Sequence, residues 1–316
     1  MTTQNTNAKH EVGNIPAAPD GSFKRPASTF RDVIERGGRF EPERDRYHLY
    51  VSYACPWATR ALIARKLKGL EDVISVTKVS PHMDEVGWAF ASVQPYPGAE
   101  KDPLYGYDHV KDLYLKADPD YTGSAILWDK KDETIVNNES SEIIRILNTG
   151  FNELLPAEKA AVDLYPEELR SDIDPLNDLI YAGINNGVYR AGFATSQDAY
   201  ERAVYEVFDA LDKVEELLKG KDYLVGDRLT EADVRLFVTI VRFDPVYHGH
   251  YKCNFRTIRH GYPAIDLWLR KIYWTVDAFK STTNFDHIKE FYYWSQIKIN
   301  PTRVVPVGPV PHIRPL

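Results

Sequence analysis

The sequence predicts a fold in two parts, a small α/β unit followed by an all-α unit. Two observations support this prediction. Between residues 46 and 150, runs rich in β-branched and aromatic residues alternate with one helical stretch before a hairpin and a second helix. From about residue 166 to residue 300, apolar residues recur at helical spacing and no strand pattern remains.

The elements of the first part can be justified in order. The run "YHLYVSY" at 47–53 is typical of a strand, and "WATRALIARKLKGL" after Pro56 is typical of a helix that ends near Gly69. "VISVTKVS" at 73–80 predicts a second strand, and a long polar and aromatic loop follows over 81–122. The hairpin then has strands at 125–129 and 134–138, and "ESSEIIRILN" predicts a helix that stops at Gly150.

The second part contains long amphipathic stretches and one clear helix start. "LTEAD" at 229–233 is a capping box from Thr230 to Asp233, which opens an apolar helix and has a structural interpretation. The predicted organisation follows from these patterns: a partly disordered arm at 1–45, an α/β domain at 46–150, a linker at 151–165, a helical domain at 166–300 and an extended tail at 301–316.

The composition excludes several classes of function. The chain has 316 residues, a formal net charge of −7 and an estimated pI of 5.8, which does not favour nucleic-acid or anionic membrane partners. No apolar run approaches the ~20 residues that span a bilayer, and the polar N-terminus does not resemble a signal peptide. The two cysteines, Cys55 and Cys253, favour a reducing and cytoplasmic setting over a disulfide scaffold.

Cys55 is the candidate for chemistry. It stands in "SYACPWATR", between a predicted strand and a helix whose first residue, Pro56, suits the first helical turn. Free N–H groups and the helix dipole stabilise a thiolate at such a position, so we expect a pKa below the ordinary value of ~8.5. A buried structural cysteine is the alternative. Residue 58 is alanine, so a reactive Cys55 would act as a single thiol.

Several stretches of the sequence resemble one family over about residues 23–308. These are "SYACPWATR", "GWAF", "TIVNNESSEIIRILN", "NNGVYRAGFATSQ", "LTEADVRLF", "RFDPVYHGHYKCN", "NFDHIKEFYYWS" and "INPTRVVPVGP". They are similar to the cysteine-type glutathione transferases, and most of all to the Xi class, the S-glutathionyl-hydroquinone reductases. The resemblance implies a thioredoxin-like, glutathione-binding domain at 46–150 packed on a C-terminal α-helical bundle.

The resemblance also implies the residues that bind glutathione. Ser140 is interpreted as a helix N-cap, and in the family the matching serine holds the γ-glutamyl carboxylate while the acid that matches Glu139 takes the ammonium group. Trp88 matches a tryptophan that borders glutathione, and the strand containing Ile126 would hold glutathione against Cys55. Glutathione is the implied co-substrate, and no metal is implied.

The aromatic substrate would lie against tyrosines of the helical half. Tyr189 and Tyr292 match the two tyrosines that hydrogen-bond the hydroquinone in the family, and Tyr293 follows them. Tyr247 and His248 are expected to border the same cavity. A zinc site formed by His248, His250 and Cys253 is a weaker interpretation of that motif, because a fourth ligand is missing from the pattern.

The implied activity is reduction of S-glutathionyl-hydroquinones through a mixed disulfide between Cys55 and glutathione. Two departures from the family keep alternatives open: the segment at Ser124–Ala125 is about three residues short and has no proline or arginine, and Gln296 stands where a histidine is common. An Omega-like thioltransferase that removes glutathione from disulfides or phenacyl conjugates is one alternative. A non-catalytic binder of phenolic ligands is the other. The family also implies a homodimer.

Overall fold

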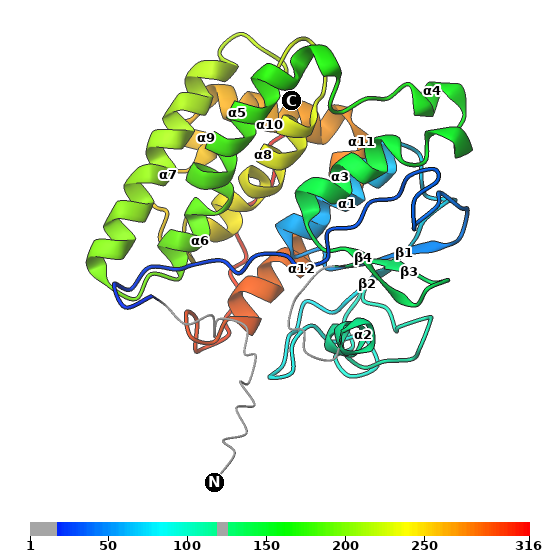
Figure 1. Cartoon of the computed structure of the whole chain (residues 1–316). Coiled ribbons are helices and arrows are strands. Elements are labelled where there is room, and N and C mark those ends of the chain that lie inside the picture. Colours follow the sequence, from blue (N-terminus) through cyan, green and yellow to red (C-terminus); the bar gives the residue numbers. More distant parts are fainter. Residues whose placement is uncertain (1–17, 119–125) are drawn as a thin grey trace.

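One four-stranded sheet forms the centre of the first half of the molecule (Figure 1). The computed structural model describes residues 18–118 and 126–316. The strands are β1 (Tyr47–Val51), β2 (Ser75–Lys78), β3 (Ile126–Asp129) and β4 (Thr134–Asn137), in the spatial order β2-β1-β3-β4. β1 and β2 are parallel, whereas β1 pairs with β3 and β3 with β4 in antiparallel fashion.

Helices cover both faces of this sheet. α1 (Pro56–Leu67) and α3 (Ser140–Thr149) pack against each other on one face, and α2 (Val110–Ala117) lies on the other (Figure 1). The strand side chains alternate accordingly, so that Leu49 belongs to the core beneath α1 and α3, and Tyr50 to a second apolar cluster beside α2.

The order of the strands decides where α1 and α3 begin. β1 is antiparallel to β3 and β3 is antiparallel to β4, so β1 and β4 run in the same direction. α1 follows β1 and α3 follows β4 after short turns. Both helices therefore begin at the same edge of the sheet, and their free N–H groups face the same region.

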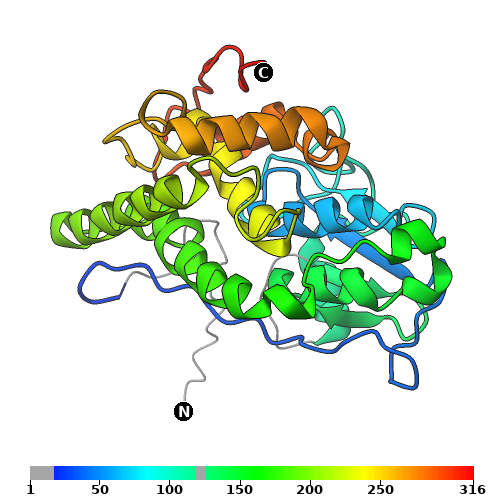
Figure 2. The same ribbon diagram turned by 90° about the horizontal axis from the view of Figure 1, so that it is seen from above.

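The second half is helical, as predicted. Its longest helix is α7 (Gln197–Leu218), and α8 (Glu231–Arg242) packs directly against α1 (Figure 2). The other helical elements are α5 (Arg170–Leu179), α6 (Gly187–Gly192), α9 (Ile258–Gly261), α10 (Pro263–Thr275), α11 (Asp277–Ser281) and α12 (Phe285–Glu290), with α4 (Ala157–Ala160) and the short 3-10 turns η1 (Asn152–Leu154) and η2 (Glu167–Leu169) in the connection. Three turns have π-helical geometry: η3 (Ile180–Asn185), η4 (Phe243–Tyr247) and η5 (Phe291–Ser295).

The sequence predicted the four strands and the helices α1 and α3, although the second strand is shorter than the predicted 73–80, at Ser75–Lys78, and two further differences concern α2 and β1. α2 lies inside the segment 81–122, which was expected to be a loop. Its eight residues bury only Val110, Leu113 and Tyr114, a pattern too short to distinguish a helix from an irregular loop. The first strand ends at Val51, before Tyr53, because the chain turns at Ser52 to present Cys55 to α1.

The segment that precedes β1 contacts both halves. Residues 20–25 lie against the start of α7, where the backbone N–H of Thr195 donates to Gly21 O at 3.0 Å. Farther along, Asp32 N donates to Val136 O of β4 at 3.0 Å. The dark-blue trace in Figures 1 and 2 follows this path from the helical half to the sheet.

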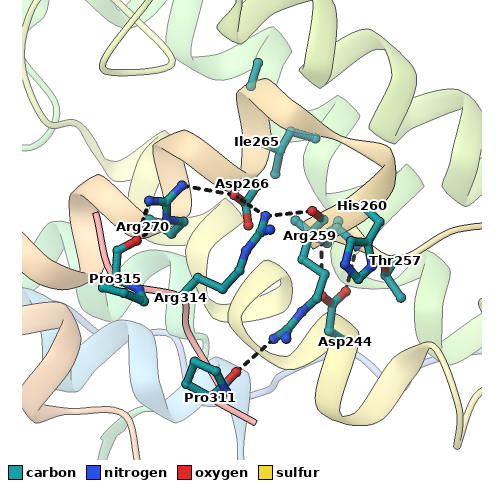
Figure 3. A network of polar contacts seen from close by, with 12 residues as sticks. Asp244, Thr257, Arg259, His260, Ile265, Asp266, Arg270, Pro311, Arg314 and Pro315 are labelled. Atoms are coloured by element: carbon teal, nitrogen blue, oxygen red, sulfur yellow. Dashed lines mark hydrogen bonds and ion pairs between the residues drawn. The ribbon is translucent and has the colours of Figure 1, made fainter. Parts of the chain in front are cut away.

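The C-terminal segment is held on the helical half by a network of charged groups (Figure 3). Arg314 donates to the Asp266 carboxylate at 2.8 Å and to Arg259 O at 2.7 Å. Arg259 in turn pairs with Asp244 at 3.0 Å, and Arg270 donates to Pro315 O at 2.9 Å.

Among the described residues, no helix combines the length and the apolar character needed to cross a bilayer.

The predicted capping box of α8 is confirmed, and it leads to a test of stability. The buried Asp233 carboxylate accepts from Thr230 N, Leu224 N and Trp268 Nε1, each at 3.0 Å. Asp233→Ala would leave these buried donors without an acceptor, so we expect a loss of about 3 kcal/mol in the free energy of unfolding. Urea denaturation would measure it. Asp227→Ala is the control, since this side chain is 97% exposed and its removal should cost less than about 0.5 kcal/mol. Equal losses in the two variants would contradict the structural role of Asp233.

Candidate active site

Cys55 lies at the N-terminus of α1, as predicted. It is the N-cap residue with extended backbone angles, and Pro56 is the first helical residue. Cys55 O accepts from Thr59 N at 3.1 Å and from Thr59 Oγ1 at 2.9 Å, which fixes the first turn of the helix. Cys55 as a residue is partly exposed, and it is not disulfide-bonded. These features place the thiol beside free helical N–H groups.

Arg242 of α8 secures the loop before Cys55 from the other half of the molecule. Its fully buried guanidinium donates to Tyr53 O at 2.8 Å and to Ala54 O at 3.1 Å. A further bond of 2.9 Å reaches Thr59 Oγ1. All these acceptors are neutral, so the positive charge of Arg242 is not cancelled locally and acts on the nearby thiol.

The expected lowering of the Cys55 pKa is wrong for this structure, where the net shift is upward. Burial raises the pKa of the Cys55 thiol because it disfavours the thiolate. The N–H groups of Ala58 and Trp57 act in the opposite direction. The charges of Arg242 and Arg25 also lower the pKa of Cys55. The sequence correctly predicted that Cys55 stands at a helix N-terminus. No local sequence pattern predicted the desolvation of its thiol.

A small pocket opens beside the thiol. Its wall is formed by residues at the end of β1, at the start of α1, after β2 and at the start of α2, namely Tyr50, Val51, Ser52, Cys55, Ala58, Val79, Trp88 and Val110. Trp88, predicted to border glutathione, is therefore in the same pocket as Cys55. Its ring stacks on Phe291 with centroids 4.6 Å apart, which connects this pocket to the helical half.

The second predicted anchor is confirmed as a helix N-terminus, with a correction of one residue. Glu139, not Ser140, is the N-cap of α3, because the Glu139 carboxylate accepts from Ser141 N at 3.1 Å. Glu139 also accepts from Ser28 Oγ at 3.1 Å. Ser140 is the first helical residue, and its hydroxyl lies 3.3 Å from the buried Arg60 guanidinium. Both predicted side chains lie at the sheet edge that α1 and α3 share.

Ile126 is the first residue of β3 and pairs with Tyr50 of β1. Its side chain is buried in the apolar cluster beside α2. Any contact of Ile126 with glutathione would thus involve its backbone. The shortened segment at Ser124–Ala125 lies outside the described residues.

Three tyrosines from distant parts of the helical half meet through their hydroxyl groups. Tyr189 Oη lies 2.6 Å from Tyr292 Oη, and Tyr247 Oη lies 3.0 Å from Tyr292 Oη. All three side chains are buried. Burial raises the pKa of each of the three hydroxyls, so they remain protonated and can donate. We call these residues the tyrosine cluster.

Two of the three residues in the tyrosine cluster belong to π-helical turns. Tyr247 ends η4 and Tyr292 lies in η5. A π-helical turn inserts one extra residue per turn and so changes the direction of the side chains that follow. Pro245 lies within η4 and cannot donate a backbone hydrogen bond, which accounts locally for the widened turn there.

The neighbours of the tyrosine cluster partly match the prediction. Tyr293 is half-buried, donates to Pro245 O at 3.3 Å and contacts the His250 ring at a centroid distance of 4.7 Å. His248 directly follows η4 as its C-cap residue and is half-buried. Of the two histidines in this motif, His250 is the one whose ring lies beside that of Tyr292, with centroids 6.3 Å apart.

Gln296 is bound on both sides. Its Oε1 lies 2.9 Å from His250 Nε2, and its Nε2 donates to Tyr251 Oη at 3.1 Å. Burial lowers the pKa of His250 to about 4, so this imidazole is neutral near pH 7. Among residues 18–118 and 126–316, no group of three His, Cys, Asp or Glu side chains is arranged to hold a metal ion.

Sequence analysis missed the contribution of the N-terminal segment. The Arg25 guanidinium lies over the Trp57 ring at 4.6 Å and over the Tyr189 ring at 4.8 Å from each centroid. Arg25 therefore joins the first turn of α1 to the tyrosine cluster. Nothing in a polar stretch of 45 residues pointed to this arginine, although its position two residues after Phe23 could have suggested an anchored segment.

Comparison with known proteins agrees with this geometry. Residues 54–149 match the family model for the N-terminal domain of glutathione S-transferase, and residues 197–271 match that for the C-terminal domain. The crystal structure of the glutathione-S-transferase Xi from Phanerochaete chrysosporium has a TM-score of 0.95 and 61% identity, and covers 97% of this chain and 98% of its own. The chain belongs to the Xi class of glutathione transferases.

Other relatives of this Xi-class transferase have names that state a bound ligand, an activity or a likeness to another class. The Xi glutathione transferase ECM4 from Saccharomyces cerevisiae, solved in complex with glutathione, has a TM-score of 0.90 and 44% identity over 93% of this chain and 99% of its own. Glutathionyl-hydroquinone reductase PcpF from Sphingobium chlorophenolicum is 50% identical over 92% of this chain and 90% of its own. Glutathione S-transferase omega-like 2 from Schizosaccharomyces pombe is 52% identical over 94% and 96%. Glutathione is the co-substrate of this family.

The two cysteines should differ sharply in reactivity. Burial raises the pKa of Cys253 to about 12, and its side chain is fully buried, whereas Cys55 is partly exposed. At pH 8 we expect iodoacetamide to modify Cys55 alone in the folded protein, because Cys253 gains thiolate only as the pH approaches 12. Intact-mass and peptide analysis would show one adduct before unfolding and two after it. Modification of Cys253 as fast as Cys55 in the native protein would contradict this.

Proposed function

We propose that the protein reduces S-glutathionyl-hydroquinones with glutathione, using Cys55 as the nucleophile. The observation that carries the proposal is the placement of a thiol at the N-terminus of α1 near the tyrosine cluster. Cys55 and Tyr189 are close enough for the thiolate to raise the pKa of the Tyr189 hydroxyl. Relatives named glutathionyl-hydroquinone reductases, at about half identity over nearly the whole chain, support the same activity.

The reaction proceeds in two steps. In the first, the Cys55 thiolate attacks the sulfur of the glutathionyl group, and the bond between that sulfur and the ring carbon breaks. Before the attack, the hydroxyl next to the carbon that bears the sulfur passes its proton to that carbon, so the electron pair of the broken bond leaves as the phenolate of the diphenol, which then takes up one proton. In the second step, the thiolate of another glutathione attacks the mixed disulfide, which releases oxidised glutathione and restores the Cys55 thiolate.

The residues around the thiol have separate roles in this scheme. The first turns of α1 and α3 offer N–H groups to the anionic ends of glutathione, with Ser140 and Glu139 at the start of α3. Trp88 borders the thiol end in the pocket shared with Cys55. The tyrosine cluster donates hydrogen bonds to the oxygens of the diphenol, with Tyr293 and His248 beside it.

Replacing the nucleophile tests the scheme directly. Cys55→Ser should abolish turnover while retaining glutathione affinity, because a serine hydroxyl cannot form the mixed disulfide. Incubation with oxidised glutathione should add a single group of ~305 Da to the unmodified protein, reversible by thiol and absent in the variant. Cys253→Ala is the matched control and should keep both turnover and the adduct. Reductase activity in Cys55→Ser would overturn the proposal.

The tyrosine cluster should affect rate more than glutathione binding. Tyr292→Phe removes the hydroxyl shared by Tyr189 and Tyr247. We expect kcat for a glutathionyl-hydroquinone to fall on the order of 10- to 100-fold, while KM for glutathione changes little. Tyr205→Phe, at a tyrosine that is 60% exposed, is the control. An unchanged kcat in Tyr292→Phe would remove the cluster from the mechanism.

An Omega-like thioltransferase is the second candidate, favoured by the buried Gln296 and by the relative named omega-like 2. Turnover on glutathionyl-menadione, phenacyl-glutathione and hydroxyethyl disulfide separates the two activities. A reductase should prefer the first substrate, in which an aromatic ring can contact the tyrosine cluster. Preference for the other two would replace the proposed activity.

We also propose a cytoplasmic homodimer. Support comes from two unpaired cysteines, which suit a reducing compartment, and from the dimers implied by the Xi class. Light scattering after size-exclusion chromatography would test the assembly, and a monomer at micromolar concentration would refute it. Fluorescent tagging in cells would test the compartment.

A further inference from the structure

We propose that Arg25 of the N-terminal segment is a positioning residue that supplies positive charge to the reaction: it stabilises first the Cys55 thiolate and then the phenolate of the departing diphenol. The inference rests on the proposed function and adds a residue outside both family-model regions. It follows from how Arg25 is anchored, from its surroundings and from its unused hydrogen-bonding capacity.

The segment that carries Arg25 is fixed at both ends. Before Arg25, Gly21 has a φ of +82° and packs so closely on Ser196 that an added Cβ would lie 2.5 Å from Ser196 Oγ. Phe23 is buried and its ring lies 5.3 Å from that of Phe193. After Arg25, Ser28 Oγ donates to Glu139 at the start of α3. Arg25 is therefore held in place by the backbone on either side of it.

The guanidinium lies among aromatic rings. It is 4.6 Å from the centroid of Trp57 and 4.8 Å from that of Tyr189, distances at which a cation is attracted to a ring face. Trp57 is the second residue of α1 and Tyr189 belongs to the tyrosine cluster. Arg25 thus contacts a neighbour of the nucleophile and a proposed ligand of the leaving group at once.

The guanidinium of Arg25 has hydrogen-bonding capacity that is not used by the described residues. Arg25 Nε donates to the neutral Asn186 Oδ1 at 3.0 Å, and the buried Nη2 has no hydrogen-bond partner in this part of the chain. Within residues 18–118 and 126–316 the ion pairs of the structure do not include Arg25. An arginine that is partly buried and lacks a carboxylate costs stability, and such a cost is typical of functional sites.

The proposed step creates anions next to this charge. The thiolate of Cys55 carries the charge before attack, and the phenolic oxygen carries it after the bond between sulfur and the ring breaks. The positive charge of Arg25 lowers the pKa of both the Cys55 thiol and the Tyr189 hydroxyl. Its electric field therefore acts on the nucleophile and also on the tyrosine cluster, which is the proposed binding site of the leaving diphenol. A guanidinium remains protonated throughout the physiological pH range and can serve both anions.

Two variants cancel this charge in different ways. Arg25→Met removes it, and Asn186→Asp places a carboxylate beside the guanidinium without removing it. Both should move the pH midpoint of Cys55 alkylation by iodoacetamide to higher pH and lower kcat/KM for glutathionyl-menadione on the order of 10-fold. Arg25→Lys keeps the charge and should keep the pH midpoint near that of the wild type.

The loss should depend on the leaving group. Hydroquinones with electron-withdrawing chlorine substituents form more stable phenolates and need less help, so Arg25→Met should impair them less than unsubstituted ones. A steeper dependence of kcat on the pKa of the hydroquinone is a result that a purely structural role would not produce. Arg36→Met is the control, because this arginine lies in the same segment, pairs with Glu153 and has a side chain that is 79% exposed.

The outcomes separate the inference from the proposed function. If the wild type reduces glutathionyl-hydroquinones and both charge-cancelling variants keep its alkylation midpoint and its leaving-group dependence, Arg25 has no such role. If the wild type lacks reductase activity while both variants shift the midpoint, the proposed function fails and the electrostatic role at Cys55 stands. Should Arg25→Met not fold, Asn186→Asp decides between these results.

Discussion

The buried guanidinium of Arg242 is the interaction on which the site depends. It comes from the end of α8 and binds the two carbonyl oxygens that immediately precede Cys55, together with the Thr59 hydroxyl in the first turn of α1. Without Arg242, the carbonyl oxygens of Tyr53 and Ala54 would lose this hydrogen-bond donor at the junction of the two halves of the molecule. The position of the nucleophile is thus determined by a residue 187 positions later in the chain.

The junction between the two halves also brings the start of α3, where glutathione is proposed to bind, close to the helical half that contains the tyrosine cluster. Arg60 of α1 binds both Ser140 at the start of α3 and Asn185 in the helical half, and its guanidinium lies 4.6 Å from the Trp57 ring centroid. Two guanidinium groups, those of Arg25 and Arg60, therefore contact one ring that follows the nucleophile by two residues. The packing of this ring therefore links the residues proposed to bind glutathione with those proposed to bind the aromatic substrate.

Local patterns explain why the fold was predictable and parts of the site were not. The hairpin, the two helices that start at Pro56 and Ser140, and the Asp233 capping box each have a signature within a few residues, and each is confirmed. Cys55, Trp88, Tyr189 and Tyr292 were found through a helix start or through resemblance to the family. Arg25 and Arg242 have their roles through contacts with residues distant in the chain, and the widened turn η5 has no known local pattern that predicts it, whereas Pro245 lies within η4.

The predominance of arginine over histidine near the thiol has a physical consequence. His250 is neutral near pH 7, because burial lowers its pKa to about 4, and it is engaged by Gln296. Positive charge that acts on the Cys55 thiol then comes from arginines, among them Arg242 and Arg25. Between pH 6 and 8 the variation in rate should follow the thiols of Cys55 and glutathione rather than an imidazole. A site of this kind gains activity as pH rises, since both steps consume a thiolate.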